Sequence, residues 1–152
     1  PTTINPEDVA FTASMDPLSS KSKTVAVNQN KIVRQDFHLG TSQISVSSIS
    51  LSTSQVTNKV TTQSLEICNL GGALLSWEFN DDHPWVSENP LTGNTPTNTC
   101  STVDVIFDSS GLAAGEHAGN LEIVNSDPDS PLITIPVTLT VIPQLYLPLI
   151  LK

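Results

Sequence analysis

Apolar and polar residues alternate along several short segments in the second half of the chain. The clearest is 132–142, in which Ile135, Val137 and Leu139 are separated by Pro136 and Thr138. Side chains on a β-strand point to opposite faces in turn, so this pattern predicts a strand with one buried face. The segments that read as strands, separated by turn residues, are 44–51, 60–69, 74–80, 85–87, 101–108, 119–125 and 132–142.

The spacing of these segments is typical of a β-sandwich, and the alternation also predicts its core. Pro136 has no N–H to donate, so its strand should be open on one side there or carry a bulge. We expect an all-β, Ig-like antiparallel β-sandwich with Trp77 at its centre and Trp85 sealing its edge. The other predicted core residues are Leu65, Ile67, Val103, Val105, Phe107, Leu121, Ile123, Ile133, Ile135, Val137, Leu139 and Val141.

The first 43 residues form an N-terminal extension with strand-like composition. Segments 9–14, 24–27 and 32–39 are rich in apolar and β-branched residues, and 28–30 (NQN) is a plausible hairpin turn between the last two. An isolated hairpin is marginal in water, so these strands need another surface to lie on. The expected organisation is therefore an extension at 1–43, a sandwich at 44–142 and an apolar C-terminal strand at 143–152.

The C-terminal segment is almost uninterruptedly apolar between Leu145 and Leu151. It is too short to span a bilayer, and exposed it would be a strand-prone edge. One interpretation is that it extends the last strand over its own domain. The other is that it adds as a strand to a neighbouring molecule, where backbone hydrogen bonds supply affinity. The residues expected to mediate assembly are Val33, Phe37, Leu39, Leu145, Tyr146, Leu147, Leu149, Ile150 and Leu151.

Charge is distributed unevenly along the 152 residues, whose formal net charge is -9. Lys or Arg occurs at positions 21, 23, 31, 34 and 59 and then not again before Lys152, while most of the acids follow Val60. The part of the chain after Val60 is therefore acidic and repels nucleic acid phosphates and anionic lipid, so neither is an expected partner. No apolar run is long enough to cross a membrane. Copies of the chain or adjoining domains are the partners we expect.

Two cysteines are placed where neighbouring strands would meet. Cys68 ends segment 60–69 and Cys100 precedes 101–108, and in an Ig-type sheet these strands are antiparallel neighbours. Both thiols fall on the outward face, which predicts a cross-strand disulfide and an extracellular or cell-surface location. Two unrelated free thiols are the alternative, and the absence of a CxxC motif argues against zinc.

Catalytic and metal-binding patterns are weak. His38, His83 and His117 have no neighbouring nucleophile motif, so we expect neither an enzyme nor a cofactor. The loops 80–82 and 125–129 carry Asn and Asp, whose oxygens suit calcium. The same residues serve as turn formers that bond their own backbone, and the two loops should lie at opposite ends of the sheet, so no metal site is expected.

The ordered set of short motifs in the sandwich resembles the BACON-like bacterial Ig-like domains and the Ig-like repeats of large bacterial surface proteins, over about residues 48–142. The matching pieces are 65–71 (LEICNLG), 75–77 (LSW), 84–87 (PWVS), 90–93 (PLTG), 112–115 (LAAG), 125–131 (NSDPDSP) and 135–141 (IPVTLTV). The resemblance implies a non-catalytic spacer or binding module of secreted, often multidomain, proteins. The cysteines are not part of that pattern.

A second, smaller resemblance covers the extension. Residues 24–30 (TVAVNQN) and 35–39 (QDFHL) look like the last strands of a carboxypeptidase-regulatory-like domain. The sequence thus leaves two hypotheses. One is a non-catalytic extracellular structural subunit that self-associates through its terminal strands into a filament or surface array. The alternative is an Ig-like spacer or ligand-binding accessory module of a larger secreted bacterial peptidase or glycosidase.

Overall fold

The computed structural model describes residues 7–15, 18–27, 32–37, 39–80 and 82–144. Within these ranges every regular element is a strand, and there are eleven. The strands are β1 (Glu7–Met15), β2 (Leu18–Val27), β3 (Ile44–Val46), β4 (Leu51–Val56), β5 (Val60–Asn69), β6 (Leu75–Phe79), β7 (Val86–Asn89), β8 (Thr92–Thr95), β9 (Thr99–Asp108), β10 (Gly115–Asn125) and β11 (Leu132–Ile142).

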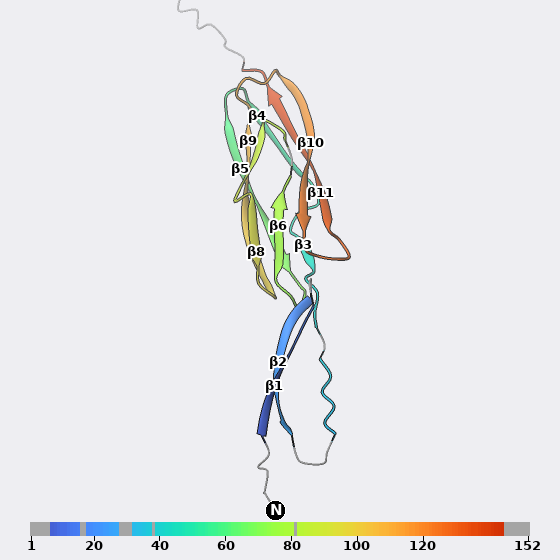
Figure 1. Cartoon of the computed structure of the whole chain (residues 1–152). Helices are drawn as coiled ribbons and strands as arrows, with labels where there is room; N and C mark the ends of the chain where they lie inside the picture. The colour runs from blue at the N-terminus through green and yellow to red at the C-terminus, as the bar shows by residue number, and fades with distance from the viewer. Residues whose placement is uncertain (1–6, 16–17, 28–31, 38, 81, 145–152) are drawn as a thin grey trace, which may run out of the picture.

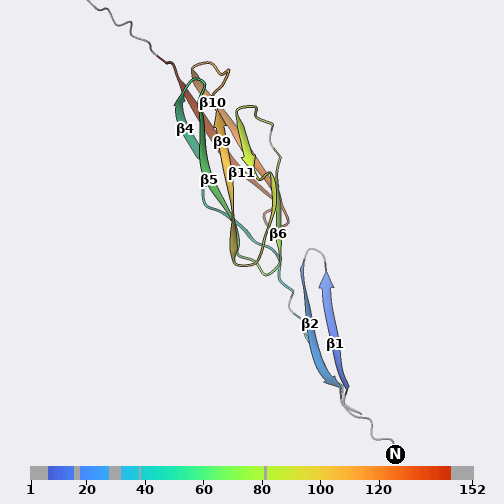
Figure 2. The ribbon, with the colours of Figure 1, turned by 90° about the vertical axis from the view of Figure 1, so that its left-hand side faces the viewer.

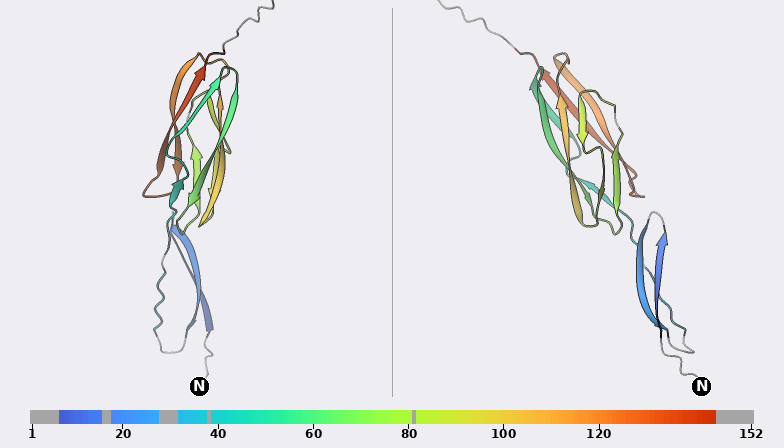
Figure 3. Two further views of the ribbon diagram at one scale, coloured as in Figure 1. Left: turned by 180° about the vertical axis from the view of Figure 1, so that it is seen from behind. Right: turned by 60° about the vertical axis from the view of Figure 1, so that its left-hand side comes forward.

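Two sheets pack face to face, and a separate hairpin extends from one end of them (Figure 1). One sheet has the order β4-β11-β10-β6-β8 and the other the order β3-β5-β9-β7. The hairpin β1–β2 lies beyond the end at which β3 begins, and Figure 2 and Figure 3 show the same placement from other sides. This end is called the proximal pole here, and the end at which β11 finishes is the distal pole.

The core lies between the sheets, where the alternating strands turn their apolar residues inward. Phe107, Leu65 and Leu121 are fully buried, and Trp77 and Trp85 are nearly so. The Trp77 indole Nε1 donates a hydrogen bond of 2.9 Å to Thr95 Oγ1, which satisfies its polar atom inside the core. All the predicted core residues are buried except Ile133, which is partly exposed and packs against the cluster. The expected all-β, Ig-like sandwich is confirmed.

The first strand of the sandwich differs from the expectation. Instead of one strand over 44–51, the chain forms β3, which pairs with β5, and then β4, which pairs with β11 in the other sheet. The β4–β11 ladder is parallel, whereas the expectation was an antiparallel sandwich. The chain changes sheets after Ser47, whose Oγ accepts a hydrogen bond from the Glu66 N–H while its own N–H bonds to the Glu66 carbonyl.

β4 is rich in polar residues, so a search for alternating hydrophobicity does not detect it. Its sequence LSTSQV contains a glutamine, Gln55, that is buried beneath the sheet. Gln55 Nε2 donates to the Lys59 carbonyl at 2.9 Å, and its Oε1 accepts from Thr61 Oγ1 at 2.7 Å. Buried polar groups are tolerated when they are hydrogen-bonded in this way. The short β8 (TGNT) was missed for a related reason, because Gly93 packs against the Trp77 ring rather than contributing an apolar side chain.

Pro136 sits where its missing donor costs nothing. It lies opposite Asn120 in the β10–β11 ladder, and the Asn120 N–H points away from β11 to His83. Asn120 and Pro136 therefore form a pair that exchanges no backbone hydrogen bonds, and the proline nitrogen faces the β4 side. Pairing with β4 begins only at Val137, so the predicted open side is found at this position.

The N-terminal hairpin pairs different segments from those expected. β1 pairs with β2 in an antiparallel register, with Val9 opposite Val25 and Phe11 opposite Lys23. Segments 9–14 and 24–27 are thus strands, as predicted, but they pair with one another. Segment 32–37 is extended beside the hairpin without joining its ladder, which corrects the third predicted strand. The predicted turn at 28–30 lies outside the described residues.

Residues 40–44 attach the extension to the proximal pole. The Thr41 carbonyl accepts hydrogen bonds from the N–H groups of Gly72 and Ala73, at 2.8 and 3.1 Å, and Ser42 Oγ donates to the Ser126 carbonyl at 2.7 Å. A Cβ on Gly71 would lie 2.3 Å from the Thr41 oxygen, so only glycine permits this approach. The glycine turn therefore serves the incoming chain as well as the reversal into β6.

Asn69 holds the centre of this attachment. Its side chain is fully buried, and its Nδ2 donates to the carbonyls of Ala73 and Thr95 at 2.7 and 3.0 Å. Its Oδ1 accepts from the N–H groups of Gly71 and Gln43 at 2.9 and 3.2 Å. All of the polar atoms of the amide are thus used to join three separate segments.

Replacing Asn69 by alanine should lower the free energy of unfolding by about 3 kcal/mol or more, because it leaves two buried carbonyls and two N–H groups without partners. Urea unfolding followed by tryptophan fluorescence measures the change. Asn94 on β8 provides the control, because Asn94→Ala removes the same type of side chain at an exposed position and should change stability little. Equal stability of the two variants would contradict the role assigned to Asn69.

Candidate functional site

One face of the N-terminal hairpin carries exposed apolar side chains, together with Lys23 opposite Phe11 and Lys21 opposite Ala13. Val9 of β1 lies opposite Val25 of β2, and residues opposite one another in a ladder share a face. Phe11 and Val27 lie on that face too, because each is two residues along its strand from one of this pair. Phe11 is 45% exposed, and Met15, further along the same face, is 61% exposed. The opposite face carries small and polar residues such as Thr12 and Ser22, whose hydroxyls bond to each other at 2.6 Å.

Segment 32–37 runs along the apolar face and leaves a hollow between the two. The hollow has a volume of about 380 Å³. Val33 and Phe37, two residues expected to mediate assembly, line it, while Leu39 is partly buried nearer the sandwich. The hairpin residues were not predicted as part of a site, although apolar residues alternate at Val9 and Phe11 and again at Val25 and Val27. The lining residues are Phe11, Val25, Val27, Val33, Gln35 and Phe37.

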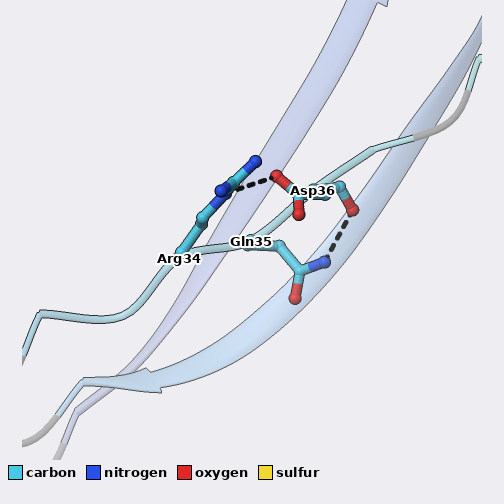
Figure 4. Close-up of polar contacts among 3 residues, drawn as sticks. All are labelled: Arg34, Gln35 and Asp36. Atoms are coloured by element: carbon cyan, nitrogen blue, oxygen red, sulfur yellow. Dashed lines mark hydrogen bonds and ion pairs between the residues drawn. The ribbon is translucent and has the colours of Figure 1, made fainter.

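The side chains of Arg34, Gln35 and Asp36 form hydrogen bonds within segment 32–37 itself (Figure 4). The Arg34 Nε donates to Asp36 Oδ1 at 2.9 Å, and both side chains are well exposed. Gln35 Nε2 donates to the Asp36 carbonyl at 2.8 Å. An exposed pair of this kind contributes little stability, so the segment is not fixed by charge.

The other residues expected to mediate assembly are Leu145, Tyr146, Leu147, Leu149, Ile150 and Leu151, and all of them lie outside the described residues. β11 ends at Ile142, at the distal pole (Figure 1). The two predicted groups of assembly residues therefore depart from opposite poles of the sandwich.

Cys68 and Cys100 form a disulfide across β5 and β9, as predicted. They are directly opposite one another in the ladder, and their Cα atoms are 3.9 Å apart. Cys68 also pairs with Ser45 of β3, so the bond lies on the outer face beside the anchored segment. It joins positions 32 apart in sequence and closes the loop that contains β6, β7 and β8.

A second, polar hollow of about 430 Å³ lies where β6 has left the edge of β10. His83 Nε2 accepts a hydrogen bond from the Asn120 N–H at 3.2 Å, and its ring stacks on Trp85 with centroids 5.8 Å apart. Trp85 in turn stacks on Phe107 in the core, so the edge-sealing role expected of it is correct. The hollow is lined by Asn80, Asp82, His83, Asn120 and Glu122.

The remaining histidines do not join this hollow. His117 lies near the Ala113 carbonyl, with Nε2 at 2.9 Å, and His38 is outside the described residues. Within the described part of the chain, no three His, Cys, Asp or Glu side chains lie close enough together to hold a metal ion.

The Asp-rich turn after β10 uses its side chains on its own backbone. Asn125 Oδ1 accepts from the Asp127 N–H, and Asp127 Oδ1 accepts from the Asp129 N–H, each at 2.9 Å. Asp127 Oδ2 also accepts from the Ile44 N–H at 2.9 Å. This hydrogen bond joins the turn to β3, and the sequence did not reveal it. These bonds are the turn chemistry expected for Asn and Asp.

One carboxyl on a solvent-facing turn has a shifted acidity. Hydrogen bonds from Ser110, first from its side chain and then from its backbone N–H at 2.8 Å, lower the pKa of Asp108 below its ordinary value. Both bonds favour the ionised form, and burial opposes them only weakly. The shift belongs to a turn and creates no acid or base suited to catalysis near neutral pH.

Comparison with known proteins identifies the fold. Neither protein-family models nor curated proteins give a match. Among solved structures, PapD-like domain 7 of human CEP192 is similar, with a TM-score of 0.59 and 11% identity over 78% of this chain and 98% of that domain. A Porphyromonas gingivalis protein of unknown function has a TM-score of 0.58 and 17% identity over 93% of this chain and 69% of that one.

A third similar structure is the CsuC–CsuE complex of a chaperone with a tip adhesion subunit from Acinetobacter baumannii pili. Its TM-score is 0.52 at 10% identity, over 65% of this chain and 57% of that one. At these identities the likeness establishes the Ig-like, PapD-like β-sandwich fold alone. Within the described residues, no helix is long and apolar enough to cross a bilayer.

Reduction of the Cys68–Cys100 disulfide should lower the free energy of unfolding by about 3–4 kcal/mol, because it restores conformational freedom to a loop of this length in the unfolded chain. Urea unfolding with and without reductant measures the loss. A Cys68→Ser/Cys100→Ser double variant supplies the control, since reductant should not affect its unfolding. An unchanged midpoint for the reduced wild-type chain would contradict a stabilising role.

Proposed function

We propose that this chain is a non-catalytic extracellular structural module that associates head to tail with copies of itself through its terminal segments. The observation that carries the proposal is the group of exposed apolar side chains on one face of the hairpin, which the sandwich does not need for its own core. Monomeric proteins seldom leave such surfaces uncovered, and large ones mark interaction sites. The domain organisation proposed with it is an extension at 1–43, a sandwich at 44–142 and a C-terminal strand at 143–152.

The geometry of the two poles favours an open assembly. The extension joins at the proximal pole and β11 ends at the distal pole, so contacts made by the two ends involve different surfaces (Figure 3). Heterologous contacts of this kind continue from copy to copy unless the rotation closes a ring. A filament or a surface array is the arrangement that results.

The disulfide supports an extracellular or cell-surface location, because such bonds persist mainly in oxidising compartments. The sequence resemblance to BACON-like bacterial Ig-like domains agrees with the sandwich fold and with a secreted, non-catalytic module. A carboxypeptidase-regulatory-like origin of the extension is a further part of the proposal, supported by the motifs at 24–30 and 35–39.

A second candidate function is that of a spacer or ligand-binding accessory module of a larger secreted bacterial enzyme. The polar hollow around His83 favours it, because its amide and carboxylate side chains could bond a hydroxyl-rich ligand. A chain that stays monomeric and is retained on immobilised polysaccharide would support this function over self-association.

Deletion of residues 145–152 should abolish assembly and leave the sandwich folded, because the deleted residues follow β11 in the sequence and the described core is built from residues that precede them. Light scattering coupled to size exclusion, over a series of concentrations, measures the mass of each chain. The near-ultraviolet circular dichroism of Trp77 and Trp85 reports the fold.

Val124→Ser is the matched control, since it removes an exposed apolar side chain from the sandwich and should not affect assembly. If the full and shortened chains have the same mass at every concentration, the proposal fails.

A further inference from the structure

The side chains that line the hollow beside the hairpin carry no charge, and the hollow is open to solvent. Five of its six lining residues are apolar, and the sixth is Gln35. Of the charged side chains on the neighbouring backbone, Arg34 and Asp36 bond to each other, and Lys23 lies opposite Phe11 on the same face without lining the hollow. An occupant suited to this site is an apolar, extended segment that presents alternate side chains to it.

Residues 145–151 have that chemistry. In an extended conformation Leu145, Leu147, Leu149 and Leu151 would share one face, since side chains alternate along a strand. Pro148 falls on the other face, and proline is accepted in a strand that pairs on one side only. The segment carries no charge between Leu145 and Leu151, which matches the uncharged hollow.

The same molecule cannot supply this segment to its own hollow. From Ile142 at the distal pole, Leu151 is nine residues away and can reach at most about 32 Å. The eleven residues of β11 alone span about 33 Å back toward the proximal pole. The separation of the two poles therefore already uses the whole reach of the segment.

The hollow lies still further away. Leu18 borders a depression that also includes Gly72 and Ala73, which places this end of β2 at the proximal pole. Val25, which lines the hollow, is seven residues further along β2, or about another 23 Å. A total of about 56 Å exceeds the reach of residues 143–151 by a wide margin.

We propose that the hollow between the hairpin and segment 32–37 binds residues 145–151 of a second copy of this chain. The inference rests on the head-to-tail association proposed above and names its two mating surfaces. The alternative attraction, between the basic N-terminal third and the acidic body, would weaken in salt, whereas contact between two uncharged surfaces persists.

Cross-linking between two differently labelled chains tests the contact. One chain carries Val25→Cys and the other Leu147→Cys, and mild oxidation of the mixture should give a disulfide-linked heterodimer. The native cysteines do not interfere, because they are bonded to each other. Ala26→Cys is the matched control, since Ala26 is exposed on the opposite face of β2 and should give little heterodimer.

A second variant tests the energetics. Val25→Ser should weaken assembly by roughly tenfold or more, since it removes apolar area from the contact. Ala26→Ser should leave assembly unchanged. The hairpin lies outside the sandwich core, so both variants should keep the circular dichroism of the folded sandwich. Assembly of the wild-type chain should persist as the salt concentration rises.

The outcomes separate this inference from the function on which it rests. If deletion of 145–152 abolishes assembly, but Val25→Ser assembles normally and no heterodimer forms, the hollow is the wrong acceptor and head-to-tail association stands. If the wild-type chain is monomeric at all concentrations, both fail. Heterodimer formation with Val25→Cys and not with Ala26→Cys, together with weakened assembly of Val25→Ser, supports the site.

Discussion

The close approach of residues 40–44 to the 69–73 turn decides how the whole chain is laid out. Gly71 admits the Thr41 carbonyl at a distance that no side chain would allow, and Asn69 bonds both partners. On the far side, Asp127 holds the Ile44 N–H. Since this contact fixes where the extension leaves the sandwich, it also fixes which pole the hairpin occupies and where its apolar face is presented.

The parts of the fold that could be predicted are those whose stability comes from apolar alternation. β5 and β11 have the bounds expected from sequence, and Phe107 and Leu139 are buried as the period of two requires. β4 could not be found in this way, because its buried Gln55 is held by hydrogen bonds, one of them to the carbonyl of Phe107, which is distant along the chain. Its parallel pairing with β11 joins segments far apart in the chain, and the local sequence carries no signal for it.

The candidate site was predictable to a smaller extent. Val33 and Phe37 were found from their alternation, and the structure places both beside the hairpin. Phe11 and Val25 are not assigned to the site from sequence, because the turn residues at 28–30 predict that segment 24–27 pairs with segment 32–39, whereas it pairs with β1. Pairing between short strands of similar composition depends on which backbone edges meet, and periodicity alone does not decide that.

The parallel pairing of β4 with β11 has a mechanical consequence. The chain enters β4 from the proximal side, beside the middle of β11, and both strands end at the distal pole, with Leu51 opposite Val137 and Val56 opposite Ile142. A pulling force applied through the two poles would slide these strands past each other along their length. Their hydrogen bonds lie across that direction and would share the load together, instead of breaking one after another as in a peeled hairpin. The connections of the sandwich are therefore suited to resist a pulling force applied along its long axis.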